Sequence, residues 1–295
     1  MNNIKTLLIA NRGEIACRII KTAKQLNIKT IAIYATPDSG ALHCQLADEA
    51  YCVGEASVEK SYLNIQNILK VAKLAHADAI HPGYGFLSEN ATFAKECEKN
   101  GIIFVGPSSD AIRKMAVKDE AKAIMSKALV PCVPGYMGKD QSPETLLKEA
   151  NKIGYPIMIK AAFGGGGKGM RVVHQEAQLR DAIESAKRES LSSFGNDALF
   201  LEKYLSQSRH IEVQIFRDSF GNCVHLFERD CSLQRRHQKI IEESPAIDIP
   251  DNIKQKLYSA AINAANAIDY LGAGTIEFLY TNDNHFYFME MNTRL

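Results

Sequence analysis

Apolar positions in the first 110 residues alternate between short continuous runs and helical spacing. The run TLLIA at 6–10 predicts a buried strand, and apolar residues three and four apart over 14–26 predict a helix. We expect Ser61 to cap one later helix and Gly101 to close another. Repeated strand–helix–strand units imply an α/β fold with a doubly wound parallel sheet. The remaining elements expected here are strands at 30–34, 78–81 and 102–105, and helices at 61–74 and 91–100.

The pattern changes near residue 114, where we place a boundary between two domains, 1–114 and 115–295. Residues 108–127 are mostly helical in spacing, and prolines and glycines interrupt the chain at 131–143. Strands dominate the rest of the chain, so the second domain is expected to be α+β. The expected strands are 155–160, 170–173, 198–202, 210–217, 223–228, 274–280 and 285–291, and the expected helices are 176–189 and 253–271.

Composition narrows the class of protein. Lys and Arg number 35 and Asp and Glu 34, a net charge of +1, which argues against nucleic acid or an anionic membrane as the main partner. No apolar run approaches the roughly 20 residues of a membrane helix, and the N-terminal apolar run is too short for a signal peptide. The 7 cysteines are scattered without a CxxC pair, so we expect neither a disulfide framework nor a structural zinc site. A reducing cytoplasm is the expected location.

A glycine-rich loop joins two predicted strands. Five of the six residues 164–169 are glycine, with Lys168 among them, and Lys160 ends the entering strand. Consecutive glycines let backbone N–H groups approach phosphate oxygens. The loop matches neither a Walker A sequence nor GxGxxG, and its place between two strands favours a lid that closes over a triphosphate. A flexible surface hairpin is the alternative.

Two acidic strands near the C-terminus form a predicted hairpin. If Asp283 and Asn284 make the turn, Glu277 faces Glu290, and Asn292 lies on the same face. Opposed like charges in an apolar hairpin are destabilising, and a hard divalent cation such as Mg²⁺ would offset the repulsion. A one-residue change in loop length would break the pairing and turn one Glu to solvent.

Two further segments carry candidate chemistry. In 228–239, Arg235, His237 and Lys239 alternate and would form an anion-binding strip on one side of an extended segment, unless the run is only a solvated face. The loop 81–90 and residues 11–14 follow predicted parallel strands, at the sheet edge where α/β folds bind ligands. A rigid turn with a helix cap explains 81–90 equally well.

Together these motifs resemble the biotin carboxylase component of the biotin-dependent carboxylases, over the whole chain. The resemblance implies a Rossmann-like parallel-sheet N-terminal domain and then an ATP-grasp domain, with a glycine-rich lid at about 131–203 and an incomplete C-terminal sheet from 204. The lid motif and Ala41-Leu42-His43 look closer to α subunits of acyl-CoA carboxylases of the methylcrotonyl or propionyl type. The matching stretches are 9–16, 81–90, 164–171, 228–239 and 290–294.

The resemblance also implies residue roles and partners. Glu277, Glu290 and Asn292 match ligands of Mg²⁺ (or Mn²⁺), Lys239 and Arg294 match groups that hold bicarbonate, and Arg294 is tied most directly to catalysis. The implied reaction is ATP-dependent carboxylation of biotin on a carrier domain through carboxyphosphate, with a carboxyltransferase subunit as partner and a homo-oligomer as a possibility. Besides Glu277 and Glu290, the implied nucleotide contacts are Lys118, Lys160, Gly166, Gly167, Glu202, Lys203, Leu205, His210 and His237.

The sequence departs from the family pattern at its end. The family continues beyond Asn-Thr-Arg into Gln-Val-Glu-His-Pro, whose Glu is the base for bicarbonate, and a later Arg helps to hold biotin. This sequence stops at Leu295 and holds no Met-Lys-Met biotin-attachment motif. We therefore expect a truncated part of a longer subunit that binds Mg-ATP weakly and is nearly inactive on free biotin. Another ATP-grasp ligase, of the carbamoyl-phosphate or purine type, and a non-catalytic nucleotide-binding remnant are the alternatives.

Overall fold

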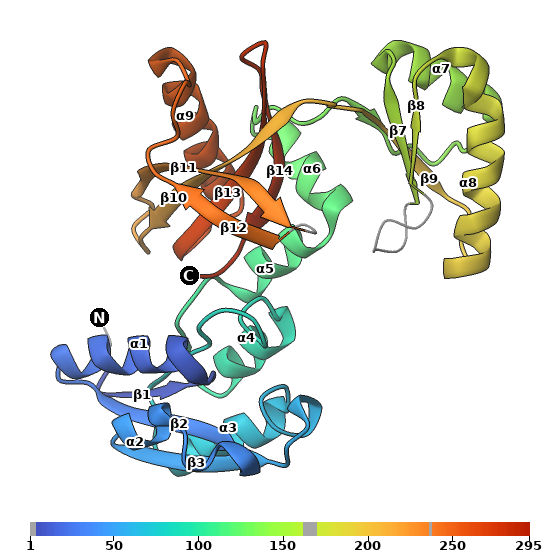
Figure 1. Cartoon of the computed structure of the whole chain (residues 1–295). Coiled ribbons are helices and arrows are strands. Elements are labelled where there is room, and N and C mark those ends of the chain that lie inside the picture. The colour runs from blue at the N-terminus through green and yellow to red at the C-terminus, as the bar shows by residue number, and fades with distance from the viewer. Residues whose placement is uncertain (1–3, 162–169, 236–237) are drawn as a thin grey trace.

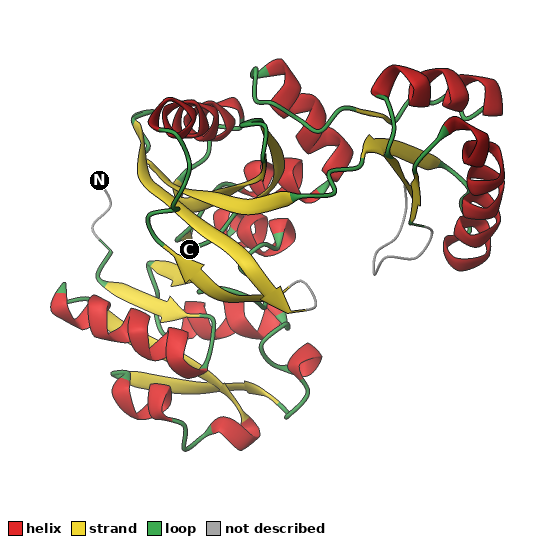
Figure 2. Ribbon diagram, turned by 45° about the horizontal axis from the view of Figure 1, so that its top comes forward, coloured by secondary structure: helices red, strands yellow, loops and turns green. Residues whose placement is uncertain are grey.

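A computed structural model describes residues 4–161, 170–235 and 238–295, with the side chains of 118, 119 and 194 excepted. The chain forms three bodies: an N-terminal layered domain, an antiparallel-sheet body, and a lid that stands apart from the body (Figure 1; Figure 2). Among the described residues, no helix combines the length and apolar character that a bilayer crossing needs. All seven cysteines are present as free thiols.

The N-terminal domain is the expected doubly wound layer, with a parallel sheet in the order β3-β2-β1-β4-β5. Alternate residues of β1 enter different cores: Leu8 packs in the cluster with α3 and α4, and Leu7 and Ile9 pack in the cluster with α1. The elements are β1 (Thr6–Ile9), α1 (Gly13–Gln25), β2 (Lys29–Ala35), α2 (Leu42–Leu46), β3 (Glu49–Gly54), α3 (Ile65–Leu74), β4 (Ala79–His81), α4 (Ala91–Lys99) and β5 (Ile103–Phe104).

Two details of this domain differ from the sequence prediction. The helix expected from Ser61 begins four residues later, because Asn64 is the cap and its side chain accepts from Asn67 N at 3.0 Å. Ser61 instead donates its hydroxyl to the Ser57 carbonyl oxygen at 2.7 Å. The edge strand β3 was not expected. The predicted closure of α4 is confirmed, since Gly101 has a φ of +69° directly after the cap residue.

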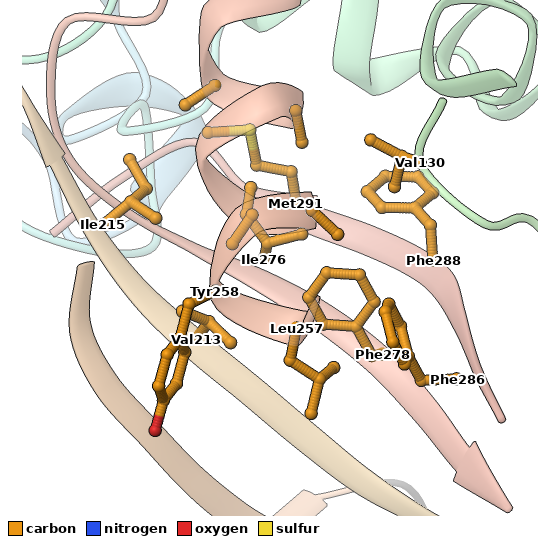
Figure 3. Close-up of a cluster of buried hydrophobic side chains, with 14 of the residues drawn as sticks. Val130, Val213, Ile215, Leu257, Tyr258, Ile276, Phe278, Phe286, Phe288 and Met291 are labelled. Carbon is orange, nitrogen blue, oxygen red and sulfur yellow. The ribbon is translucent and has the colours of Figure 1, made fainter. Parts of the chain in front are cut away.

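The body is an antiparallel sheet in the order β12-β11-β10-β13-β14. One face packs on α9 through a large apolar core that includes Val213, Ile276, Phe278 and Leu257 (Figure 3). The helix α6 contributes Met125 and other residues to the same core. The body elements are α5 (Ser109–Ala116), α6 (Lys118–Lys127), β10 (Ser208–Arg217), β11 (Cys223–Arg235), β12 (Gln238–Glu243), α9 (Asp251–Ala267), β13 (Gly272–Thr281) and β14 (Phe286–Asn292). The expected division at residue 114 falls inside α5 and stays a prediction.

The lid has its own sheet, in the order β6-β9-β7-β8, and its own apolar core. Its helix α7 was not expected from the sequence, although Ser142 is a regular N-cap and accepts from Thr145 N, with Pro143 in the first helical position. The lid elements are β6 (Gly135–Tyr136), α7 (Pro143–Ile153), β7 (Ile157–Ala161), β8 (Arg171–Val173), α8 (Leu179–Phe194) and β9 (Leu199–Lys203).

Candidate active site

A polar pocket of about 800 Å³ lies on the face of the body sheet that turns away from α9. The pocket is polar because successive side chains of a strand point to opposite faces of the sheet. In β10, Ile211, Val213 and Ile215 are buried in the core, and the residues between them line the pocket. All five strands and the last two residues of the chain contribute side chains: His210, Glu212, Gln214, Arg229, Gln234, Gln238, Lys239, Ile240, Glu242, Thr275, Glu277, Met289, Glu290, Asn292, Arg294 and Leu295.

The acidic hairpin has the predicted pairing for a different reason. Glu277 faces Glu290, and Thr275 faces Asn292. The two-residue turn assumed from the sequence is wrong, because Thr281 N donates to His285 O at 2.9 Å and closes a three-residue loop. That loop alone would shift the register by one residue. A bulge that leaves Met289 without a partner in the ladder shifts it back, so the two acidic residues still meet.

Glu277 is a buried carboxylate that several side chains of the pocket hold in place. It is 2% exposed, and it accepts from His210 Nε2, Asn292 Nδ2 and, at 2.7 Å, from Lys239 Nζ. Burial by itself would raise the pKa of Glu277, but the hydrogen bonds from His210 and Lys239 outweigh it and lower the pKa to about 2. Glu277 is therefore ionised throughout the neutral range.

Lys239 lies between two carboxylates. Its Nζ is 2.5 Å from Glu212 Oε2 and 2.7 Å from Glu277 Oε1. Burial by itself would lower the pKa of Lys239. The hydrogen bonds to the two carboxylates outweigh this effect and raise the pKa above its ordinary value, so the ammonium stays charged. Glu212, whose Oε1 also accepts from Arg229 at 2.5 Å, is a pocket residue that the sequence analysis missed. The polar alternation His210, Glu212, Gln214 was the available signal.

The predicted strip of Arg235, His237 and Lys239 does not exist as one extended segment. The chain reverses between β11 and β12, with Arg235 opposite Gln238 and Gln234 opposite Lys239. Adjacent residues of a strand point to opposite faces, so Arg235 and Lys239 point away from each other, and only Lys239 lines the pocket. His237 lies outside the described residues.

A second group of charged residues lies at the base of the lid. Glu202 of β9 is 7% exposed and forms ion pairs with Lys160 of β7 and Lys122 of α6. The side chain of Lys203 donates to the carbonyl oxygens of residues 154 and 155, and Leu205 lies half-buried in the segment between β9 and β10. Of the other implied nucleotide contacts, Gly166 and Gly167 and the Lys118 side chain are outside what the structure describes.

Glu212, Cys231 and Glu242 also bring ligand atoms within 4.8 Å of one another. Burial, followed by the charge of Glu212, raises the pKa of the Cys231 thiol to about 12. Sulfur is a soft ligand that suits other metals, whereas the hairpin offers the hard oxygen ligands that Mg²⁺ prefers, so the hairpin is the better candidate for Mg²⁺.

Comparisons with known proteins agree with this geometry. A family model described as biotin carboxylase, N-terminal domain, matches residues 3–112, and one described as carbamoyl-phosphate synthase L chain, ATP binding domain, matches 117–295. The chain belongs to the biotin carboxylase family. A mitochondrial methylcrotonoyl-CoA carboxylase subunit alpha from Dictyostelium discoideum is 57% identical over 99% of this chain, which spans 42% of that relative.

Solved biotin carboxylases have the same fold. The enzyme of Campylobacter jejuni superposes with a TM-score of 0.87 at 51% identity, over 99% of this chain and 66% of that one. The biotin carboxylase domain of the Hydrogenobacter thermophilus 2-oxoglutarate carboxylase, solved with MgADP, ADP and bicarbonate, has a TM-score of 0.85 at 44% identity, over 100% of this chain and 65% of that one. The predicted ATP-grasp architecture is thereby confirmed.

The N-terminal loops of this biotin carboxylase family member reach the end of β14. Glu89 accepts from the Thr293 backbone amide at 2.9 Å, directly before Arg294 at the pocket edge. Asn11 donates to the carbonyl oxygens of Pro82 and Tyr84 at 2.7 and 2.8 Å, so residues 11–14 and 81–90 do share one sheet edge as predicted.

Proposed function

We propose that this chain is the ATP-binding part of an enzyme that carboxylates biotin with ATP and bicarbonate. Bicarbonate attacks the γ-phosphorus of ATP, which releases ADP and forms carboxyphosphate. Carboxyphosphate breaks down to CO₂ and phosphate. The phosphate takes the proton from the ureido nitrogen of biotin, and that nitrogen then attacks the CO₂. The observation that carries the proposal is the convergence of two opposed carboxylates with Lys239 and Arg294 in one pocket.

The pocket fits a magnesium or manganese ion on its donor chemistry. Glu277 and Glu290 offer carboxylate oxygens from directly opposed positions, and Asn292 contacts Glu277 from the same strand as Glu290. Such hard oxygen donors suit Mg²⁺, and these three residues would hold it. The ion, when bound, would neutralise charge on the phosphate oxygens.

The cationic side chains supply the remaining roles. Lys239 is charged and already bridges two carboxylates, so bicarbonate can replace one of them without leaving the ammonium unpaired. Arg294 carries a permanent charge at the pocket edge and is the residue that we tie to catalysis. His210 donates to Glu277 and fixes that carboxylate for its ligand role.

The proposal also covers the partner proteins of this chain and its location in the cell. Relatives named as methylcrotonoyl-CoA carboxylase subunits favour an acyl-CoA carboxylase of the methylcrotonyl or propionyl type. Such an assembly requires a biotinyl carrier domain and a carboxyltransferase subunit, and we expect both, with homo-oligomerisation as a further expectation. A cytoplasmic location stays a prediction, since named relatives include mitochondrial proteins.

Binding and turnover of ATP by the 295-residue protein test the function. We expect Mg²⁺-dependent ATP binding in calorimetry, weakened at least about tenfold by Glu290→Gln, which removes one charged ligand. Glu243→Gln, at an exposed position of the same sheet, is the matched control. ADP release should be slow and rise with bicarbonate, and labelled bicarbonate should enter free biotin only at trace levels.

Two results would contradict the proposed function, and a third would contradict only the expected low activity of this chain. Stimulation of ADP release by ammonia instead of bicarbonate would indicate a ligase of the carbamoyl-phosphate type. Thermal stabilisation by ATP with no turnover under any of these conditions would indicate a non-catalytic nucleotide-binding protein. Rapid biotin-dependent turnover by this chain would refute the expectation that the chain alone is nearly inactive.

A further inference from the structure

The Glu202 carboxylate forms ion pairs with two lysines that come from different bodies of the molecule. Lys160 lies on β7 of the lid and pairs with Oε2, and Lys122 lies on α6 and pairs with Oε1. Both ammonium groups lie over the ring of Phe200, at 5.4 and 5.9 Å from its centroid. The Phe200 ring therefore covers one side of the three charged groups and partly shields them from water.

The two lysines are fixed by separate cores. Ala121 and Met125 anchor α6 in the core of the body, whereas Ile159 and Leu201 anchor β7 and β9 in the core of the lid. In Figure 1, α6 lies between the body sheet and the lid. The pair between Lys122 and Glu202 thus connects body to lid at the place where the chain enters the lid.

The roles of the two lysines differ in the proposed reaction. Lys160 is the penultimate residue of β7, the strand that leads to the glycine-rich loop, and is one of the implied nucleotide contacts. If Lys160 turns to the phosphates of ATP, Glu202 loses a cationic partner while it remains almost buried. Such a loss disfavours the exchange strongly unless another cation stays with the carboxylate.

We propose that Lys122 is a positioning residue for nucleotide binding: it keeps Glu202 paired, so that Lys160 can transfer from Glu202 to the triphosphate. This inference rests on the proposed function, and neither the motifs nor the resemblance implied a role for Lys122. Lys122 itself acts through Glu202 and Lys160 and is not expected to touch the phosphates.

Calorimetry on the 295-residue protein tests the proposal with three variants. We expect Lys122→Met to raise the Kd of Mg-ATP about tenfold or more, and Lys122→Arg to keep it near the wild-type value, because only the first removes the charge. Adenosine offers no phosphate to Lys160, so Lys122→Met should weaken its affinity by less than about threefold. A competition assay, in which adenosine displaces a fluorescent ATP analogue, measures that affinity. Lys127→Met, an exposed position on the same helix, is the matched control.

A double-mutant cycle separates this role from a merely structural one. In a Glu202→Gln background no buried carboxylate remains that needs a cationic partner, so adding Lys122→Met should change the Kd of Mg-ATP by less than about threefold. An equal loss for adenosine and ATP, an undiminished loss in the Glu202→Gln background, or no loss at all would overturn the inference. A wild-type chain that binds no Mg-ATP would instead overturn the proposed function, and this inference with it.

Discussion

Replacing Glu277 by glutamine should destabilise the antiparallel body in a pH-dependent way. The folded protein holds the pKa of Glu277 at about 2, below the ordinary value of 4.5, because the hydrogen bonds from His210 and Lys239 outweigh the effect of burial. That difference corresponds to about 3 kcal/mol of stability at pH 7. Solvent screening reduces it little, since Glu277 is 2% exposed.

The direction of the pH dependence follows from where Glu277 binds a proton more readily, in the folded or in the unfolded chain. Because the unfolded chain binds a proton at Glu277 more readily than the folded one, the stabilisation is complete above about pH 5.5 and declines as the pH falls from 4.5 towards 2. The difference in free energy of unfolding between wild type and Glu277→Gln should therefore shrink from about 3 kcal/mol at pH 7 to about 2 kcal/mol at pH 3.5.

Urea unfolding at both pH values measures this difference, and hydrogen exchange of residues 272–292 identifies the transition that belongs to the hairpin. Glu243→Gln, at an exposed position of the same sheet, controls for the loss of one negative charge. A gap between wild type and Glu277→Gln that is the same at pH 7 and pH 3.5 would refute the reasoning. So would a variant as stable as wild type at pH 7.

Three other substitutions test contacts outside the pocket. Tyr258→Phe removes the hydroxyl that donates to buried Glu228 and should lower the free energy of unfolding by about 1–3 kcal/mol, measured by urea denaturation. Gly83→Ala should cost about 1–3 kcal/mol in the same assay, because Gly83 has a φ of +65° and a methyl group there would lie 2.9 Å from a side-chain nitrogen. Glu89→Ala removes the acceptor of the Thr293 amide and should speed hydrogen exchange of residues 290–295 at least about tenfold, with no change in β1.

The layered N-terminal domain was predictable because its strands and helices each carry a strong local signal. Buried runs such as 6–10 and the spacing over 14–26 need no tertiary information. The helix cap was misplaced because Ser61 and Asn64 are both good cap residues. In the fold Asn64 caps the helix, and the Ser61 hydroxyl donates to the Ser57 carbonyl oxygen instead. The half-exposed strand β3 gave no buried run to detect.

The site was predictable only where strand periodicity sufficed. The pairing of Glu277 and Glu290 came out right although the turn was wrong, because the bulge at Met289 compensates for the longer loop. The reversal between Arg235 and Gln238 was missed, since residues 236–237 are Arg and His and carry none of the usual turn residues.

Ion pairs between residues far apart in the chain could not be predicted from the sequence. Lys122 sits on a helix with charged neighbours and looks like an ordinary surface lysine, and its partner Glu202 lies 80 residues away. Only the arrangement of α6 against the base of the lid brings the two together.

Gly135 and Glu202 face each other across β6 and β9, so the chain leaves the body and returns to it at nearly one point. Paired residues on antiparallel strands have Cα atoms about 5 Å apart. The lid is thus topologically an insertion, with a separate core and adjacent ends. Such a module can be exchanged, shortened or excised between its two ends without rerouting the strands that carry the carboxylates.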